Sequence, residues 1–257
     1  MNNKVFESII LKKKKCYFIS PHYDDAVLSA GAVMTYLAKT NDIYVINIFT
    51  EAGKHPYTLS AKAYLNQCGY ENAEDLYKDR KTEDREVLGK IVKESVDLGF
   101  TDALWRKKTH TNSFGRFLTE FDHIYPTYKF HIQKGKLHKE DQETVHAISK
   151  RLREIVDTKN SIIFCPMGIG NHVDHVMVHT ICNDIFENTI FWSDFPYNQT
   201  QGSKKNKISL NTFTFSEFLA DKKRLIEGYK TQFKAMFKQG LITKPEIYYT
   251  SLNTKTV

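Results

Sequence analysis

The sequence predicts an α/β protein with a Rossmann-like, mostly parallel sheet, helices on both faces of the sheet and an active site at the carboxyl ends of the strands. Three observations lead to this fold class. Short apolar runs alternate along the chain with segments of helical spacing. The run at 43–50 is apolar almost throughout, as expected of a strand that helices cover on both sides. Clusters of His and Asp directly follow two of the runs, where open α/β sheets bind ligands.

The first half of the chain supplies two clear strands with a helix between them. A run of strand-forming residues stops at Pro21, and from Val27 to Leu37 apolar residues recur at helical spacing. The elements expected here are a strand at 16–20, a helix at 25–39, a strand at 43–50, a helix at 79–96 and a short strand near 97–104.

The second half resumes the alternation after an irregular, loop-rich excursion at 107–140, whose length and aromatic and His content are typical of an active-site lid. We expect one α/β domain over residues 1–257, because the chain is short for two full domains and shows no internal repeat. The elements expected after the excursion are a helix at 141–159, a strand at 161–165, a helix at 172–187, a strand at 189–193, a helix at 216–239 in a C-terminal helical segment at 213–240, and a final strand at 247–250.

The distribution of charge argues against a nucleic-acid partner. The net charge of +7 is concentrated at the ends of the chain: residues 1–15 carry +4, residues 201–257 carry +7 and residues 16–200 carry −4. A nucleic-acid-binding protein usually places its basic residues on the binding face, whereas here they flank the part that carries the chemistry. The favoured interpretation of the basic ends is a solvated, lysine-rich surface.

Other features bear on the compartment. No apolar run approaches the ~18–20 residues that span a bilayer, and the apolar stretch near the N-terminus precedes its lysines, the reverse of a secretory signal. The four cysteines form no Cys-x-x-Cys pair. We therefore expect free thiols, no transmembrane segment and a cytoplasmic protein. Nothing in the sequence predicts the oligomeric state.

Two motifs contain the candidate catalytic residues. The stretch 21–25 reads Pro-His-Tyr-Asp-Asp and follows the first strand, and the stretch 171–175 reads Asn-His-Val-Asp-His and comes soon after the strand at 161–165. Both stand in strand-to-helix turns at one predicted edge of the sheet, so three carboxylates and three imidazoles can meet there. Each motif alone could be structural, because Asp is a frequent helix N-cap and favours the first turn of a helix. Two such motifs at one edge are hard to explain as caps.

These residue types suit a hydrolytic metal centre. Zinc takes imidazole and carboxylate ligands at about 2.0–2.2 Å, and catalytic zinc keeps three protein ligands with water in the open position. A bound metal lowers the pKa of its water to about 7 and polarises a carbonyl, which suits hydrolysis of a stable amide. Iron or another divalent ion fits the same ligands. A carboxylate outside the ligand set can take the proton of the water, and Asp24 is well placed for this.

The paired motifs resemble those of the PIG-L or LmbE-like family of deacetylases, which has His-x-Asp-Asp after its first strand and His-x-Asp-His later in the chain. Weaker matches extend the resemblance along most of the chain: 80–84, 101–106, 194–197 and the helix that contains Lys223 and Tyr229–Gln232. The resemblance implies a Rossmann-like sheet, a Zn2+ cofactor (with Fe2+ as an alternative) and removal of an acetyl group from an N-acetylglucosamine-type sugar. The implied partner is a small-molecule N-acetylated amino-sugar conjugate.

The resemblance also implies the roles of individual residues. His22, Asp25 and His175 become the metal ligands, and Asp24 becomes the general base. His172 becomes the group that stabilises the oxyanion or protonates the leaving amine.

Four further positions follow from the same resemblance. Asp174 would orient the His172 imidazole, Arg80 would contact a substrate hydroxyl, and Asp194 and Tyr197 would form walls of the substrate pocket. The sequence departs from the commonest family pattern at Tyr23, Ala26 and Val173. None of these positions is a proposed ligand, so the departures bear on the identity of the substrate and not on the type of reaction.

Two alternatives to an amino-sugar deacetylase remain open at this stage. One is an amidase that acts on a non-sugar N-acyl substrate. The other is a non-catalytic, metal-stabilised binding protein, which would have a closed site with a fourth protein ligand in place of water.

Overall fold

A computed structural model of the chain describes residues 4–109, 119–199 and 210–251. Its centre is a seven-stranded sheet with the order β3-β2-β1-β4-β5-β7-β6, which confirms the predicted α/β class. Strands β1 to β5 are parallel, whereas β7 runs antiparallel to both β5 and β6. The strands are β1 Lys15–Ser20, β2 Ile43–Glu51, β3 Glu94–Thr101, β4 Ser161–Pro166, β5 Thr189–Trp192, β6 Asn211–Phe215 and β7 Glu246–Thr250.

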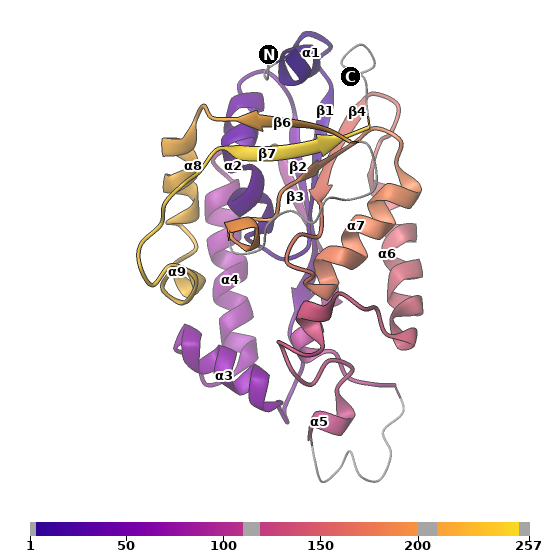
Figure 1. Cartoon of the computed structure of the whole chain (residues 1–257), viewed down its shortest axis with the longest axis vertical. Coiled ribbons are helices and arrows are strands. Elements are labelled where there is room, and N and C mark those ends of the chain that lie inside the picture. Colours follow the sequence, from indigo (N-terminus) through magenta and orange to yellow (C-terminus); the bar gives the residue numbers. More distant parts are fainter. Residues whose placement is uncertain (1–3, 110–118, 200–209, 252–257) are drawn as a thin grey trace.

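Helices cover both faces of this sheet. Helices α2, α4, α8 and α9 lie on one side, and α6 and α7 lie on the other (Figure 1). The helices are α1 Lys4–Leu11, α2 Asp25–Leu37, α3 Leu59–Cys68, α4 Ala73–Leu88, α5 Thr119–Asp122, α6 Gln142–Ile155, α7 Val173–Ile185, α8 Leu219–Ile226 and α9 Lys230–Met236. None of these described helices is both long and apolar enough to cross a bilayer.

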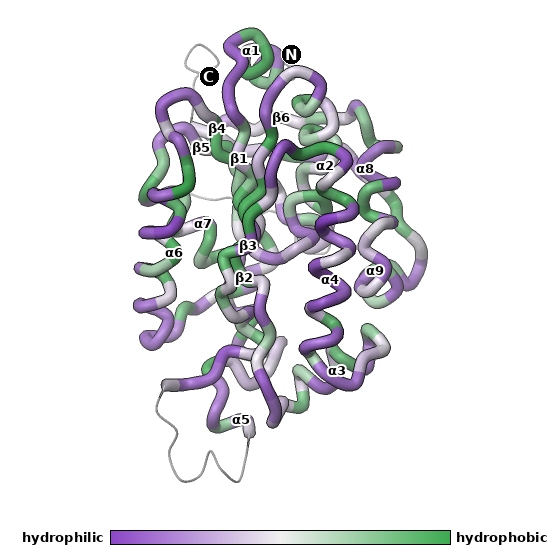
Figure 2. Tube along the Cα trace, turned by 180° about the vertical axis from the view of Figure 1, so that it is seen from behind, coloured by the Kyte–Doolittle hydropathy of each residue, from purple (hydrophilic) through white to green (hydrophobic). Residues whose placement is uncertain are grey.

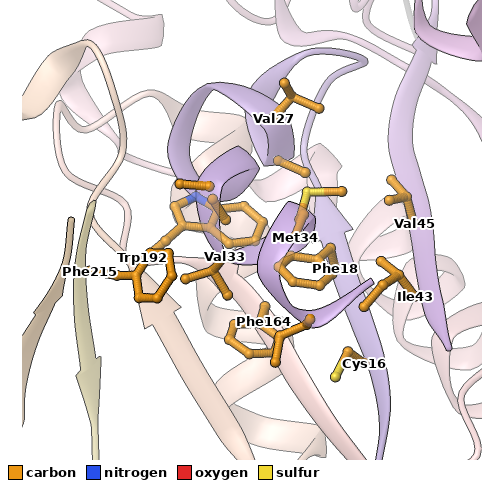
Figure 3. Close-up of a cluster of buried hydrophobic side chains, with 14 of the residues drawn as sticks. Cys16, Phe18, Val27, Val33, Met34, Ile43, Val45, Phe164, Trp192 and Phe215 are labelled. Atoms are coloured by element: carbon orange, nitrogen blue, oxygen red, sulfur yellow. The ribbon is translucent and has the colours of Figure 1, made fainter. Parts of the chain in front are cut away.

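The central strands are apolar on both faces because each face packs against a layer of helices. Phe18 of β1 and Phe164 of β4 point toward α2, where their rings stack with centroids 4.4 Å apart beside Met34 (Figure 3). Tyr17 and Ile19 alternate with Phe18 and point toward α6 and α7. The central strands are accordingly green in Figure 2, between helices of mixed colour. This double burial explains the nearly continuous apolar runs of the sequence.

The strand order places the two motifs next to each other. From β1 the chain first forms β2 and β3 on one side and then returns to form β4 and β5 on the other. Strands β1 and β4 are therefore neighbours, in a register that pairs Phe18 with Phe164. Ligands bind at such a topological switch point, beyond the carboxyl ends of the strands. The turns after β1 and β4, which carry the motifs, both open into this crevice.

Several helix and strand boundaries differ from those predicted, and one of the differences changes the position of a site residue relative to its strand. The helix expected at 79–96 is α4, which starts at Ala73, directly after its N-cap Asn72, and ends at Leu88. The apolar residues at 91 and 92 still pack on the core, although they lie in the turn after the helix. Strand β3 begins at Glu94 and ends at Thr101, three residues earlier than expected. Asp102 is therefore the first residue after this strand, and its side chain accepts the Leu104 N–H at 2.8 Å to start a short 3-10 turn.

The C-terminal part also differs from its prediction. The expected helix at 216–239 is two helices, α8 and α9, because the chain turns at Gly228. A Cβ at this position would lie 2.4 Å from a methyl group of Val87, so only glycine allows the backbone to approach α4 this closely. Helices α1 and α3 and strand β6 had not been predicted. In the excursion at 107–140, the structure contains α5 and 3-10 turns at 132–134 and 139–141, while 110–118 lie outside the described residues.

Candidate metal centre and active site

The two motif turns bring their His and Asp side chains into one buried cluster. Helix α2 begins at Asp25, but the Asp24 side chain makes no capping bond; the Ser20 hydroxyl accepts the Ala26 N–H instead, at 3.0 Å. Helix α7 is capped by His172, whose Nδ1 accepts the Asp174 N–H at 3.3 Å. The helix-cap explanation thus fails for Asp24, whereas Asp25 and Asp174 do lie in the first turns of their helices.

The three residues predicted as metal ligands lie within reach of one ion. Their ligand atoms all lie within 4.8 Å of one another. Asp25 Oδ2 lies 2.9 Å from His22 Nδ1 and 3.2 Å from His175 Nε2. Tetrahedral zinc with bonds of about 2.0–2.1 Å would hold its ligand atoms about 3.3 Å apart. The spacing, the residue types and the burial of all three side chains therefore fit such an ion.

Each of the two histidines also has a buried carboxylate at its outer nitrogen. His22 Nε2 lies 3.2 Å from Asp174 Oδ2, and His175 Nδ1 lies 2.8 Å from Asp194 Oδ1. Both carboxylates are fully buried. Metal-ligating histidines characteristically donate their other N–H to such a group, which fixes the ring and its tautomer. The nitrogens that face Asp25 are then the ones left to bind the metal.

The electrostatics of the cluster also favour a cation. Burial alone would lower the pKa of His22 and of His175, but neighbouring carboxylates outweigh it. The pKa of His22 rises well above its ordinary value beside Asp102, Asp174 and Asp25, and that of His175 rises to about 10 beside Asp25 and Asp194. Burial would raise the pKa of Asp25, yet His175 and His22 hold it well below its ordinary value. Without metal the cluster therefore binds protons, which a divalent ion would displace.

A second possible ligand group, His22 with His172 and Asp174, fits less well. Both oxygens of Asp174 are already engaged: Arg106 donates to Oδ1 at 2.6 Å and the Ala103 N–H donates to Oδ2 at 2.9 Å. Burial would raise the pKa of Asp174, but Arg106 lowers it. A carboxylate held by a buried guanidinium is better suited to orient an imidazole than to bind a metal.

Asp24 stands beside this centre in a different environment. Burial raises its pKa and outweighs the opposing effect of Arg80, whose Nη2 lies 3.6 Å from Asp24 Oδ1. Arg80 is itself 3% exposed and lies over the ring of Tyr77, with 4.9 Å between the guanidinium carbon and the ring centroid. The adjacent carboxylates Asp24 and Asp25 thus have opposite pKa shifts, which is typical of groups with different roles in one site.

The cluster opens into a cleft of about 550 Å³. Tyr128, from the excursion at 107–140, and Tyr197 form part of its lining, and their hydroxyls lie 3.1 Å apart. The tyrosine rings also lie beside the cluster, Tyr128 at 5.9 Å from His172 and Tyr197 at 5.6 Å from His175, between centroids. The predicted residues in the lining are His22, Asp24, Asp25, Arg80, His172 and Tyr197.

Two predicted residues lie in places other than those expected. Asp194, expected as a pocket wall, is fully buried behind His175, where its Oδ2 also accepts the Ile169 N–H at 2.7 Å. The carboxylate of Asp174 faces His22 and Arg106, and its hydrogen bond to His172 comes from the backbone N–H. Both carboxylates therefore hold the imidazoles that are predicted to bind the metal.

Three residues near the centre were not assigned a role from the sequence. Asp102 lines the cleft with Oδ2 3.4 Å from His22 Nε2, Arg106 holds Asp174, and Gln232 of α9 lines the cleft beside Asp24. Asp102 could have been found from its position after a strand if the end of β3 had been placed correctly. Arg106 and Gln232 stand in two of the segments that resemble the family, at 101–106 and 229–232, but that resemblance gave neither residue a role.

Comparison with known families agrees with this geometry. The model of the GlcNAc-PI de-N-acetylase (PIG-L) family matches residues 17–186, which is more than half of the chain. The chain belongs to the PIG-L family. The matched part runs from β1 to the end of α7 and contains both motifs, whereas β5 to β7 and helices α8 and α9 lie beyond it. No curated protein matches the sequence.

Solved structures share the fold of this PIG-L family member. A deacetylase of the teicoplanin biosynthesis pathway is 19% identical, with 91% of this chain and 96% of that chain covered and a TM-score of 0.71. The zinc-inhibited form of teicoplanin deacetylase is 18% identical, with 91% and 97% covered and a TM-score of 0.66. N,N'-diacetylchitobiose deacetylase from Pyrococcus horikoshii is 13% identical, with 92% and 79% covered and a TM-score of 0.52. At these identities the likeness concerns the fold alone.

Proposed function

We propose that this protein is a zinc-dependent N-deacetylase that hydrolyses the N-acetyl group of a small amino-sugar conjugate. One observation carries the proposal: His22, Asp25 and His175 converge at the switch point of the sheet, with Asp24 and His172 beside them in one cleft. The family supports a de-N-acetylase, and similar folds occur in deacetylases named for teicoplanin and N,N'-diacetylchitobiose.

His22 Nδ1, an oxygen of Asp25 and His175 Nε2 would hold the ion. A bound zinc ion supplies Lewis acidity, which lowers the pKa of water and polarises an amide carbonyl. Fe2+ suits the same donors and is the alternative. Among the described residues, the ligand group around Asp25 has three members rather than four, which favours an open site over the closed site of a non-catalytic binding protein.

Asp24 is the proposed general base. Its carboxylate takes a proton from the attacking water, and the raised pKa brings its basicity closer to that required at neutral pH. The same carboxyl group then returns a proton to the departing amine, so that Asp24 ends the cycle ionised.

The geometry favours one of the two roles predicted for His172. Its Nδ1 accepts the Asp174 N–H, which leaves Nε2 to carry the proton. Burial, together with His22 and His175, lowers the pKa of His172 to about 3, so the ring is neutral at neutral pH. A neutral imidazole that donates from Nε2 stabilises an oxyanion better than it protonates an amine. Asp174 and Asp194 position the two metal-binding imidazoles, and Arg80 and Tyr197 contact the sugar.

The wider assignments follow from the same proposal. Residues 1–257 act as one α/β deacetylase domain, because α8 packs on α2 and α9 packs on α3 and α4. The protein is cytoplasmic, in keeping with its four free cysteines, and it binds no nucleic acid.

Acetate release tests the function. Zinc-loaded protein should release acetate from N-acetylglucosamine glycosides, and simple N-acetyl amines such as N-acetylethanolamine should be poorer substrates. Equal or faster turnover of the simple amines would favour the non-sugar amidase instead. Asp24→Asn should lose turnover while zinc content by elemental analysis stays near that of the wild type, and His175→Ala should lose zinc. Near-wild-type turnover by Asp24→Asn would overturn the assignment of the base.

A further inference from the structure

Gln232 is a buried amide in the active-site cleft that comes from the far end of the chain. It lies on α9, beyond the part of the sequence that the family model matches, and it is 6% exposed. The amide is assigned the orientation that satisfies both neighbours, with its nitrogen toward the carboxylate and its oxygen toward the guanidinium. In this orientation the nitrogen donates to Asp24 Oδ2 at 3.1 Å, and the oxygen accepts from Arg80 Nη2 at 2.8 Å and from Arg80 Nε. One amide therefore joins the proposed base to its nearest cation.

The distances show why this bridge matters. The direct approach of Arg80 to Asp24 is 3.6 Å, which is longer than a hydrogen bond. The Gln232 amide spans the two side chains with contacts of hydrogen-bond length. Asp24 and Arg80 are each 3% exposed, so loss of this bridge would leave two buried charges short of a hydrogen-bond partner. Gln232 therefore connects Asp24 to Arg80 where the two do not bond directly.

Hydrogen bonds to α4 hold helix α9 in the position in which Gln232 contacts Asp24 and Arg80. Tyr229, at its N-terminus, donates its hydroxyl hydrogen to Asp84 Oδ1 at 2.8 Å. Thr231 donates its backbone N–H to Glu83 Oε1 at 3.1 Å and its hydroxyl to Glu83 Oε2 at 2.8 Å. Both acceptors belong to α4, which also carries Arg80 one turn earlier. These bonds hold α9 and α4 in fixed register, with Gln232 opposite Arg80.

We propose that Gln232 is a positioning residue for the general base: its side-chain amide holds the Asp24 carboxylate in the orientation needed to take a proton from water. The inference rests on the proposed deacetylation, in which Asp24 is the base. It assigns a catalytic contribution to the C-terminal helix.

Substitution by the isosteric Glu separates positioning from packing. Glu fills the same volume but replaces the N–H donor with an acceptor beside Asp24. Gln232→Glu should lower kcat for an N-acetylglucosamine glycoside by about ten- to hundredfold, the loss expected for a hydrogen bond to a charged group. KM should change by less than about threefold and zinc content should be retained. Lys234→Gln is the matched control, because it makes the same change in charge at an exposed position of α9 and should leave kcat unchanged.

A wild-type kcat in Gln232→Glu would show that Gln232 only fills space, and would overturn the inference. A variant that loses zinc would overturn it as well, because Gln232 would then support the metal site. If Gln232→Glu does not fold, Gln232→Leu provides the same comparison, with a loss near the lower end of the range.

A second measurement requires no turnover and so separates this inference from the proposed function. Wild-type protein inactive on every N-acetyl substrate would refute the deacetylase but not the contact. In a double-mutant cycle, Asp24→Ala, Gln232→Leu and the double variant are compared by urea unfolding. The effect of the double variant on the unfolding equilibrium constant should differ by about tenfold from the combined effects of the two single variants. Additive effects would overturn the inference whether or not the protein is an enzyme.

Discussion

Replacement of Asp194 by Asn tests the buried support of the metal centre. The Asp194 carboxylate accepts two N–H groups, from His175 Nδ1 at 2.8 Å and from Ile169 N at 2.7 Å, and is fully buried. Asn offers one oxygen, so one of the two N–H groups must face an NH2 group. Loss of such an outer contact typically costs 10- to 100-fold in metal affinity. The expected loss is therefore about 1.4–2.8 kcal/mol of zinc binding, at about 1.4 kcal/mol per factor of ten.

The zinc dissociation constant, measured by competition with a fluorescent chelator, checks this value. Asp157→Asn makes the same chemical change at a carboxylate whose side chain is 43% exposed, and it should leave zinc affinity unchanged. If Asp194→Asn binds zinc within threefold of the wild-type protein, the carboxylate does not support the ligand and the reasoning is refuted.

Three further predictions concern stability. In metal-free protein the proton on His175 stabilises the fold below pH 6.5, and this contribution is lost as the pH rises through about 10. The Tm of EDTA-treated protein should therefore fall more steeply over this pH range than the Tm of zinc-loaded protein. Equal changes of Tm with pH in the two forms would contradict the prediction. Burial raises the pKa of Asp84, so its stabilising contribution is lost as the pH rises above its unfolded value of 3.8. Asp84→Asn removes the charge but also loses the hydrogen bond that Asp84 Oδ2 accepts from Asn47 Nδ2. Relative to the wild-type protein, it should therefore gain about 1 kcal/mol in urea unfolding as the pH rises from 4 to 7, and an equal difference at both pH values would argue against ionisation as the cause. Phe164→Ala should cost about 3–5 kcal/mol of unfolding free energy, whereas Phe130→Ala, at a side chain 68% exposed, should stay within about 0.5 kcal/mol; similar losses in the two would contradict the core assignment.

Much of the fold could be predicted because the features that specify it are local. Strands covered on both faces must be apolar at successive positions, so the apolar runs at 43–50 and 161–165 could be predicted as buried strands. The ends of elements were less predictable, because apolar residues can pack on the core from a turn as well as from a helix. Because the end of β3 was predicted three residues too late, Asp102 was not recognised as a residue that directly follows a strand and lies near His22.

The sequence by itself determined which residues are candidates for a metal centre, because these His and Asp residues occur within short motifs at the ends of two strands. The family resemblance implied different roles for Asp24 and Asp25, but only the tertiary structure supplies a physical reason for the difference. Asp24 and Asp25 are adjacent and chemically identical, yet Asp25 faces two imidazoles while Asp24 faces Arg80 and Gln232. The partners that make this distinction come from α4, α7 and α9. Their approach depends on the packing of whole helices, such as the close contact that Gly228 allows between the backbone and α4, and no short stretch of sequence encodes it.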